Sequence, residues 1–217
     1  MKSFSDNPTP GLYLGGLCFL TAEESACPFP AARQAEAALS AGLKWVQLRM
    51  KNAARREVWE TALILRALTR ENGALLFIND YPDIALAVDA DGVHLGQDDF
   101  PLKEARGLMG QKLIGISTHS ISEAKEAAMG GADYIGFGPI FETATKDAGP
   151  ARGISSLVEV RRAVKIPIVA IGGITPGNIG QVIRAGADAT AVSGAIACGD
   201  IRENIKGFME ALKAARS

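Results

Sequence analysis

The feature that most limits the fold of this sequence is a repeated unit in which an amphipathic segment ends at glycine and a short apolar run follows. The phrases AGLKW, GGADYIGFG and AGADATAVSG share this order at three places in the chain. Glycine after a helix is a common C-terminal signal, and short apolar runs bounded by turn residues are typical of strands buried on both faces. The pattern therefore predicts strand–helix units with a parallel sheet.

Eight such units fit the chain, at about 27 residues each. The expected strands are Leu17–Thr21, Trp45–Arg49, Leu75–Asn79, Gly92–Leu95, Leu113–Ser117, Tyr134–Phe137, Pro167–Ile171 and Ala189–Val192. The expected helices are Ala31–Ala41, Arg55–Asn72, Asp83–Val88, Leu102–Met109, Ser122–Met129, Ser155–Val164, Gly177–Ala185 and Arg202–Ala215. Because right-handed crossovers of eight units close into a cylinder, we predict a single (β/α)8 TIM barrel.

The competing fold is an open, doubly wound sheet. Such a sheet usually carries GxGxxG after its first strand, and the first strand here ends Phe19-Leu20-Thr21 without it. No internal linker interrupts the repeat. We therefore expect residues 1–10 to form a loose N-terminal arm and residues 11–217 to form one barrel, the catalytic domain.

Charge and cysteine content narrow the function classes. The chain has 23 basic and 24 acidic residues, so it lacks the basic excess that favours nucleic acid or an anionic membrane. Its cysteines, Cys18, Cys27 and Cys198, form no CxxC pair, which argues against a zinc site or disulfide framework and fits a reducing compartment. With no signal peptide and no long apolar span, a cytoplasmic location is expected.

Glycine, at 24 of 217 residues, exceeds the usual share of about 7%. One group follows predicted helices and consists of Gly42, Gly73, Gly110, Gly130 and Gly186. A second group, Gly172, Gly173 and Gly194, follows the seventh and eighth strands. Loops at those two positions often bind phosphate through backbone N–H groups, so the second group predicts a phosphate site.

Polar residues gather where the predicted strands end, which in a parallel barrel is one mouth. Alternation along a strand puts Gln47, Arg49 and Lys51 on one side, where two cations and an amide could hold diphosphate. The alternative is a solvated charge pair at a strand end. These residues alone leave both interpretations open.

Asp80 and Asp99 end two adjacent predicted strands, and two carboxylates beside a cationic group suit Mg²⁺ completed by substrate phosphate and water. Spacing alone leaves Asp98 as a rival of Asp99, and Asp80 could instead cap the next helix. His94 lies in an apolar run, so we expect a structural role with its ring paired to a neighbour, and His119 is a weaker candidate still.

The segment from Gly138 to Ile154 has no clear periodicity and carries Thr143, Thr145 and Lys146. A segment of this length suggests a lid that brings donors onto a substrate, and a solvated loop is the alternative.

These residues resemble the thiamine-phosphate synthase (thiamine-phosphate pyrophosphorylase) family. The matching runs are VQLRMK, FINDYPDIALAVDADGVHLGQDD, IGISTHS, GADYIGFGPIFETATK, IPIVAIGGI and AVSGAI, which span about 70% of the chain in family order. The family's common Glu is replaced by Met50, whose side chain should point away from Gln47 and Arg49.

The resemblance implies a TIM-barrel transferase that joins 4-amino-2-methyl-5-(diphosphooxymethyl)pyrimidine to a thiazole phosphate with one Mg²⁺, giving thiamine phosphate and diphosphate. Position by position, it implies that Asp80 and Asp99 bind the metal. It assigns the pyrimidine diphosphate to Gln47, Arg49, Lys51, Asn79, Ser117 and Lys146. Of these, Arg49, Lys51, Ser117 and Lys146 would be catalytic. It assigns the thiazole phosphate to Thr143, Thr145, Gly173, Val192 and Ser193.

The expected partners are thus small molecules, with no nucleic acid and no membrane, and a homo-oligomer is compatible with the sequence. Two alternatives remain: a thiazole tautomerase-like paralogue and a non-catalytic thiamine-phosphate sensor. Neither needs the complete set of diphosphate-binding residues and paired aspartates found here.

Overall fold

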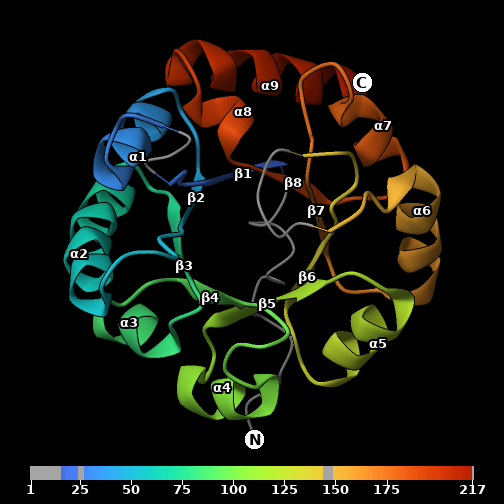
Figure 1. Cartoon of the computed structure of the whole chain (residues 1–217), viewed down its shortest axis with the longest axis horizontal. Helices are drawn as coiled ribbons and strands as arrows, with labels where there is room; N and C mark the ends of the chain where they lie inside the picture. Colours follow the sequence, from blue (N-terminus) through green and yellow to red (C-terminus); the bar gives the residue numbers. More distant parts are fainter. Residues whose placement is uncertain (1–15, 24–26, 144–148, 217) are drawn as a thin grey trace, which may run out of the picture.

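Eight parallel strands close into a barrel in chain order in the computed structural model, which describes residues 16–23, 27–143 and 149–216. Figure 1 looks into the barrel with its helices on the outside. The strands are β1 (Gly16–Leu20), β2 (Trp45–Leu48), β3 (Leu75–Asn79), β4 (Gly92–Leu95), β5 (Leu113–Thr118), β6 (Tyr134–Phe137), β7 (Ile168–Ile171) and β8 (Ala189–Val192). Pairing of β8 with β1 closes the sheet, so the predicted (β/α)8 barrel is confirmed. The predicted arm, residues 1–10, lies outside the described residues.

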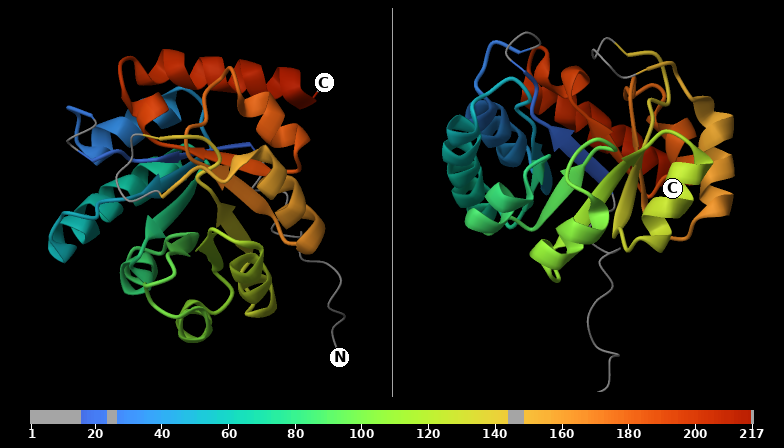
Figure 2. Two further views of the ribbon diagram at one scale, coloured as in Figure 1. Left: turned by 45° about the vertical axis from the view of Figure 1, so that its right-hand side comes forward. Right: turned by 60° about the horizontal axis from the view of Figure 1, so that its bottom comes forward.

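The helices form a layer around the strands, as both views in Figure 2 show. They are α1 (Ala31–Ser40), α2 (Arg55–Glu71), α3 (Pro82–Ala87), α4 (Leu102–Met109), α5 (Ile121–Met129), α6 (Gly153–Ala163), α7 (Ile179–Arg184), α8 (Gly194–Ala197) and α9 (Ile201–Arg216). Each predicted helix is present with bounds within two residues. The four-residue α8 was not predicted. Among the described residues, no helix is long and apolar enough to cross a membrane.

The start of α7 differs from the prediction because the preceding residues form a turn. The Thr175 N–H donates to Asn178 Oδ1 at 2.8 Å, and the Asn178 N–H donates to the Thr175 carbonyl at 3.2 Å. An Asn side chain that bonds the backbone in this way stabilises a turn, so the helix begins at Ile179 rather than Gly177.

The end of α5 also departs from the glycine pattern. Gly130 follows the helix as predicted, but its φ of −75° is an ordinary right-handed value. Gly131 carries the left-handed φ of 90° that reverses the chain before β6. Gly130 thus takes the place that Ala41 and Asn72 take after α1 and α2, and Gly131 takes the place of Gly42 and Gly73.

Aromatic rings fill the inside of the barrel. Trp45, Phe77 and Tyr134 point inward from three strands, with ring centroids 5.3–5.8 Å apart in tilted and edge-to-face arrangements. Small neighbours make this possible: a Cβ at Gly92 would lie 2.5 Å from Phe77, and one at Gly115 would overlap Tyr134. These inward glycines form a third group, distinct from the glycines that follow helices and from those that follow β7 and β8.

An aspartate clamp repeats three times at the N-terminal ends of the strands. An aspartate just before an even-numbered strand accepts hydrogen bonds from a backbone N–H of the preceding strand and from an arginine on the helix that leads into that preceding strand, at 2.5–2.9 Å. The sets are Asp91 with Leu76 and Arg66, Asp133 with Ile114 and Arg106, and Asp188 with Ile168 and Arg161. Polar residues at this face usually stabilise the barrel, which explains the repeated Asp before these strands.

Candidate active site

The buried amides of Gln47 and Asn79 lie side by side at the carboxyl ends of β2 and β3. Gln47 Nε2 donates to Asn79 Oδ1 at 3.0 Å, and the two residues are only 4% and 9% exposed. A buried amide must be hydrogen-bonded to avoid a desolvation cost, so each fixes the orientation of the other. The predicted amide of the anion-binding cluster therefore faces the barrel interior.

Arg49 and Lys51 continue β2 toward the mouth and are held by residues that follow β1. Arg49 Nη1 lies 3.5 Å from Glu23 Oε1, and the Lys51 N–H donates to the same oxygen at 2.8 Å. The buried Thr21 hydroxyl bonds both the N–H and the carbonyl of Arg49, at 2.9 and 3.1 Å. Sequence reasoning missed Glu23, although the strand-end rule applied to β1 points to it.

Asp80 follows β3 in an unusual backbone conformation. Its φ is 69°, a left-handed value that Asp tolerates better than most residues, and its N–H donates to the His94 carbonyl at 2.9 Å. Its side chain is 14% exposed, and Oδ2 lies 3.5 Å from Lys51 Nζ. Asp80 therefore joins the cationic cluster at the mouth and does not cap α3, since Tyr81 is the N-cap residue of that helix.

The carboxyls of Asp80 and Asp99 adjoin one another. Burial and a hydrogen bond with Asp99 raise the pKa of Asp80 to about 6, although Lys51 opposes this shift. Asp99 Oδ2 accepts the Gly96 N–H at 2.6 Å, and a Cβ at Gly96 would lie 2.8 Å from that oxygen. Asp98 is exposed. The geometry thus favours Asp99 over Asp98 as the partner of Asp80.

His94 lies inside the barrel between two hydroxyls. Its Nδ1 is 2.9 Å from the Tyr134 hydroxyl and its Nε2 is 2.8 Å from Ser117 Oγ. Burial lowers the pKa of His94 to about 4 and raises the pKa of Tyr134 well above its usual range. The expected pairing of His94 with a neighbour is present, and one neighbour is a predicted site residue. His119 instead bonds the Gly138 carbonyl through Nδ1, at 2.8 Å.

Gly172 and Gly173, after β7, have left-handed φ values of 95° and 63°. A Cβ at either position would strike the segment that follows β6; for Gly173 it would lie 2.7 Å from Phe141 Cβ. That segment extends beside β7, because the Ile140 N–H donates to the Ile171 carbonyl at 2.8 Å. These glycines therefore have a packing role that their assignment to phosphate did not anticipate.

The remaining predicted residues divide between β8 and the segment after β6. Val192 ends β8 and is buried, and Ser193 directly precedes the short helix α8. Thr143 is the last described residue of its segment. Thr145 and Lys146 lie outside the described residues, so the structure does not bear on their predicted positions.

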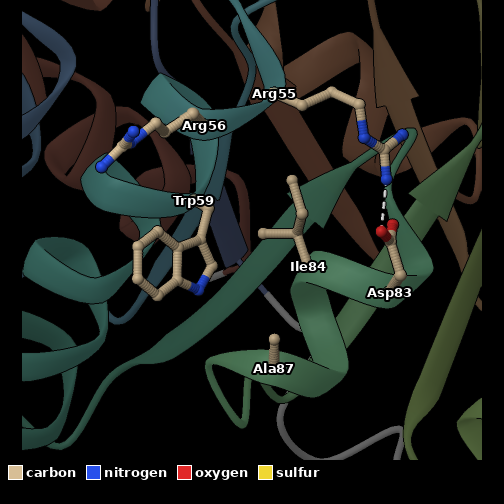
Figure 3. Close-up of a pocket in the computed structure, with 6 residues that line it drawn as sticks. All are labelled: Arg55, Arg56, Trp59, Asp83, Ile84 and Ala87. Carbon is tan, nitrogen blue, oxygen red and sulfur yellow. Dashed lines mark hydrogen bonds and ion pairs between the residues drawn. The ribbon is translucent and has the colours of Figure 1, made fainter.

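A separate pocket lies outside the barrel between α2 and α3 (Figure 3). Its lining residues are Arg55, Arg56, Trp59, Asp83, Ile84 and Ala87. None of them is a predicted site residue, and Arg55 forms an ion pair with Asp83 across its edge. The candidate site is therefore the mouth of the barrel.

Comparison with known proteins gives a consistent family. The family model described as thiamine monophosphate synthase matches residues 17–196. A thiamine-phosphate synthase of Chloroflexus aurantiacus is 54% identical over 166 residues, covering 76% of this chain and 77% of the relative. One from Halalkalibacterium halodurans is 54% identical over 154 residues, covering 70% and 73%.

A solved structure supports the same relationship. The thiamine phosphate pyrophosphorylase of Pyrococcus furiosus superposes with a TM-score of 0.87 at 38% identity, covering 94% of this chain and 98% of that one. The chain therefore belongs to the thiamine monophosphate synthase family, which is a family of transferase enzymes.

Proposed function

We propose that this protein condenses 4-amino-2-methyl-5-(diphosphooxymethyl)pyrimidine with a thiazole phosphate to give thiamine phosphate and diphosphate. The observation that carries the proposal is the meeting of Lys51 with Asp80 and Asp99 at one point of the mouth, on a chain whose relatives are named thiamine-phosphate synthase. Cations beside paired carboxylates suit a substrate whose phosphate charge is shared between side chains and a metal ion.

The metal in this proposal is one Mg²⁺ held by Asp80 and Asp99. Two adjacent carboxyls, one with a raised pKa, form an arrangement that a divalent cation stabilises. The described residues contain no group of three or more His, Cys, Asp or Glu side chains around one point. Two carboxylates suit Mg²⁺, which keeps several waters and takes phosphate oxygens as further ligands. When bound, the ion would neutralise charge that develops on the departing diphosphate.

We assign the pyrimidine diphosphate to Gln47, Arg49, Lys51, Asn79, Ser117 and Lys146. The fixed amide pair of Gln47 and Asn79 offers donors and acceptors of defined direction, which suits a heteroaromatic ring. Arg49 and Lys51 extend beyond this pair toward solvent, where the charged diphosphate would lie. Arginine supplies a planar pair of donors and lysine a point charge.

We assign the thiazole phosphate to Thr143, Thr145, Gly173, Val192 and Ser193. Support comes from the loops after β7 and β8 and from the short helix α8, since a TIM barrel frequently binds phosphate at this place. Gly194, the first residue of α8, has nothing within 4 Å of where a Cβ would stand, so there is open space beside this residue.

The reaction requires no strong base. The bond between the pyrimidine methylene carbon and the diphosphate oxygen breaks, and its electron pair leaves with diphosphate. The lone pair of the thiazole nitrogen then forms the new C–N bond, so no proton is removed from the nucleophile. Arg49, Lys51 and Lys146 would stabilise the departing anion. The lowered pKa of His94 agrees with this chemistry, because it makes the ring a poor base.

The site also supports this reaction over the two alternatives. A thiazole tautomerase-like paralogue has no need of Arg49 and Lys51, and a sensor has no need of the Asp80–Asp99 pair. We further propose a cytoplasmic location, in keeping with the buried free cysteines Cys18 and Cys27.

One assay separates the three functions. Purified protein is incubated with both substrates and Mg²⁺, and thiamine phosphate and diphosphate are measured together. The proposal expects both products in equal amounts. Folded protein that forms neither product would contradict it and favour the paralogue or the sensor.

A further inference from the structure

A hydrogen-bonded chain runs from Tyr134 through His94 to Ser117, and the proposed function uses only its last member. The three side chains come from neighbouring strands β6, β4 and β5 and point into the barrel. Gly115 and Gly136 make the chain possible. A Cβ at Gly115 would overlap the Tyr134 ring and hydroxyl, and one at Gly136 would lie 2.9 Å from His94 Cε1.

The direction of the hydrogen bonds follows from Tyr134. Its hydroxyl is buried, and within the described part of the chain His94 Nδ1 is its hydrogen-bond partner. If Nδ1 carried the proton, the tyrosine proton would have no acceptor, and a buried unpaired donor is costly. The favoured arrangement has Tyr134 donating to Nδ1, which leaves the ring proton on Nε2.

The proton on Nε2 determines how the Ser117 hydroxyl is bonded. Nε2–H donates to Ser117 Oγ, so the serine oxygen is occupied as an acceptor and its own proton is directed elsewhere. Ser117 is partly exposed at the mouth, and its carbonyl is held by Gln97 Nε2 at 2.5 Å.

We infer that Tyr134 and His94 are positioning residues that make Ser117 a hydrogen-bond donor to an acceptor atom of the pyrimidine diphosphate. The inference rests on the proposed function for the identity of the substrate. The opposite direction would make Ser117 donate to Nε2 and leave its oxygen to accept from the substrate. The two directions differ in one measurable property, which is the tautomer of His94.

Nitrogen-15 NMR of the free protein measures that tautomer without any substrate. The chain has only two histidines, so the His94 signals are identified by their loss in His94→Gln. The inference expects the proton on Nε2 and a bare Nδ1. A proton on Nδ1 would overturn it, even in a fully active enzyme.

A double-mutant cycle tests whether the hydrogen-bonded chain acts through Ser117. His94→Asn keeps a polar group near Tyr134 but no longer reaches Ser117, and we expect it to lower kcat/KM about tenfold. In the Ser117→Ala background the same change should cost less than about twofold, because the group it positions is gone. Equal losses in both backgrounds would show that His94 acts by another route and overturn the inference.

Two further variants complete the design. His94→Gln presents an amide N–H near the place of Nε2 and should retain more activity than His94→Asn. Thr118→Val is a matched control. Thr118 lies on β5 next to Ser117 and donates a buried hydrogen bond to the Gly136 carbonyl, but it is not part of the hydrogen-bonded chain. The change in kcat/KM that Thr118→Val causes should be the same in the wild-type and the Ser117→Ala backgrounds. Wild-type protein that makes no thiamine phosphate but carries the Nε2 proton would contradict the proposed function alone.

Discussion

Lys51 Nζ lies 3.5 Å from Asp80 Oδ2, so a cation assigned to the diphosphate contacts a carboxylate assigned to the metal. In the protein without ligands, the ammonium partly compensates the charge of the paired aspartates. Bound Mg²⁺ would take over that role and leave Lys51 for the substrate. The next three predictions follow from the electrostatics of this mouth.

Asp80→Asn should stabilise the ligand-free protein at pH 7. The folded-state pKa of Asp80 is raised to about 6, above an unfolded value near 4. The free energy of unfolding of the wild-type protein therefore falls as the pH rises from about 4 to about 6, because the folded state resists ionisation of this carboxyl. The gain should be on the order of 1 kcal/mol, because solvent and Lys51 offset part of the penalty. Asparagine also tolerates the left-handed φ of 69°. Urea unfolding of both proteins at pH 7 and pH 4 measures the difference, which should disappear at pH 4; a constant gain would contradict this origin.

Magnesium should raise the melting temperature of the wild-type protein, and more so above pH 6 than below it. Protons compete with the ion for the Asp80 carboxyl, whose pKa is about 6. Thermal unfolding with and without Mg²⁺ at pH 5 and pH 8 measures this. Asp99→Asn should abolish the shift, whereas Asp98→Asn, at the exposed neighbour, should retain it. An equal loss in both would contradict the choice of Asp99.

Arg49→Lys should lower kcat/KM by about 10- to 100-fold without unfolding the protein. Lysine keeps the charge but loses the planar pair of donors, and charge-assisted hydrogen bonds contribute about 1.5–3 kcal/mol. Steady-state kinetics with varied pyrimidine diphosphate measures the loss. Arg70→Lys changes an arginine in an exposed ion pair on α2 and is the matched control. Similar kinetics for the two variants would argue against substrate contact by Arg49.

Asp133→Asn should lower stability by roughly 1–3 kcal/mol and leave KM unchanged. Asp133 accepts hydrogen bonds from the Ile114 N–H and from Arg106 at the end of the barrel opposite the active site. Removing its charge weakens both bonds and leaves part of a polar cluster unsatisfied. Asp83→Asn, in an exposed ion pair with Arg55, should cost far less. Urea unfolding curves compare the two variants. An equal loss in the free energy of unfolding would contradict the stabilising role of the aspartate clamp.

Much of the fold follows from the sequence because each βα unit carries its own signals. Strands such as Leu75–Asn79 and Gly92–Leu95 were predicted with their observed bounds, since short apolar runs end abruptly at polar residues. The helix α8 was missed because four residues, Gly-Ala-Ile-Ala, are too few to show a helical period. Gly172 and Gly173 were assigned to phosphate alone because their contact with Pro139 and Phe141 is a tertiary feature.

The positions of the candidate residues could be predicted where strand ends and family motifs agree. Gln47, Asn79 and Asp80 meet at the mouth as their strand positions imply. Glu23 was missed because it follows β1, whereas the runs that match the family begin at Val46. Tyr134 and Ser117 lie 40 and 23 positions from His94 in the sequence. The register of β4, β5 and β6 brings the three side chains together, and a single sequence does not state that register.

The most direct test of the account is Mg²⁺-dependent diphosphate release by the wild-type protein and by the Asp80→Ala/Asp99→Ala double variant, both confirmed to be folded. With both substrates present, the account predicts rapid release by the wild type that depends on Mg²⁺. It predicts none above background from the variant. Full activity in the double variant would contradict the assignment of the paired aspartates to the active site.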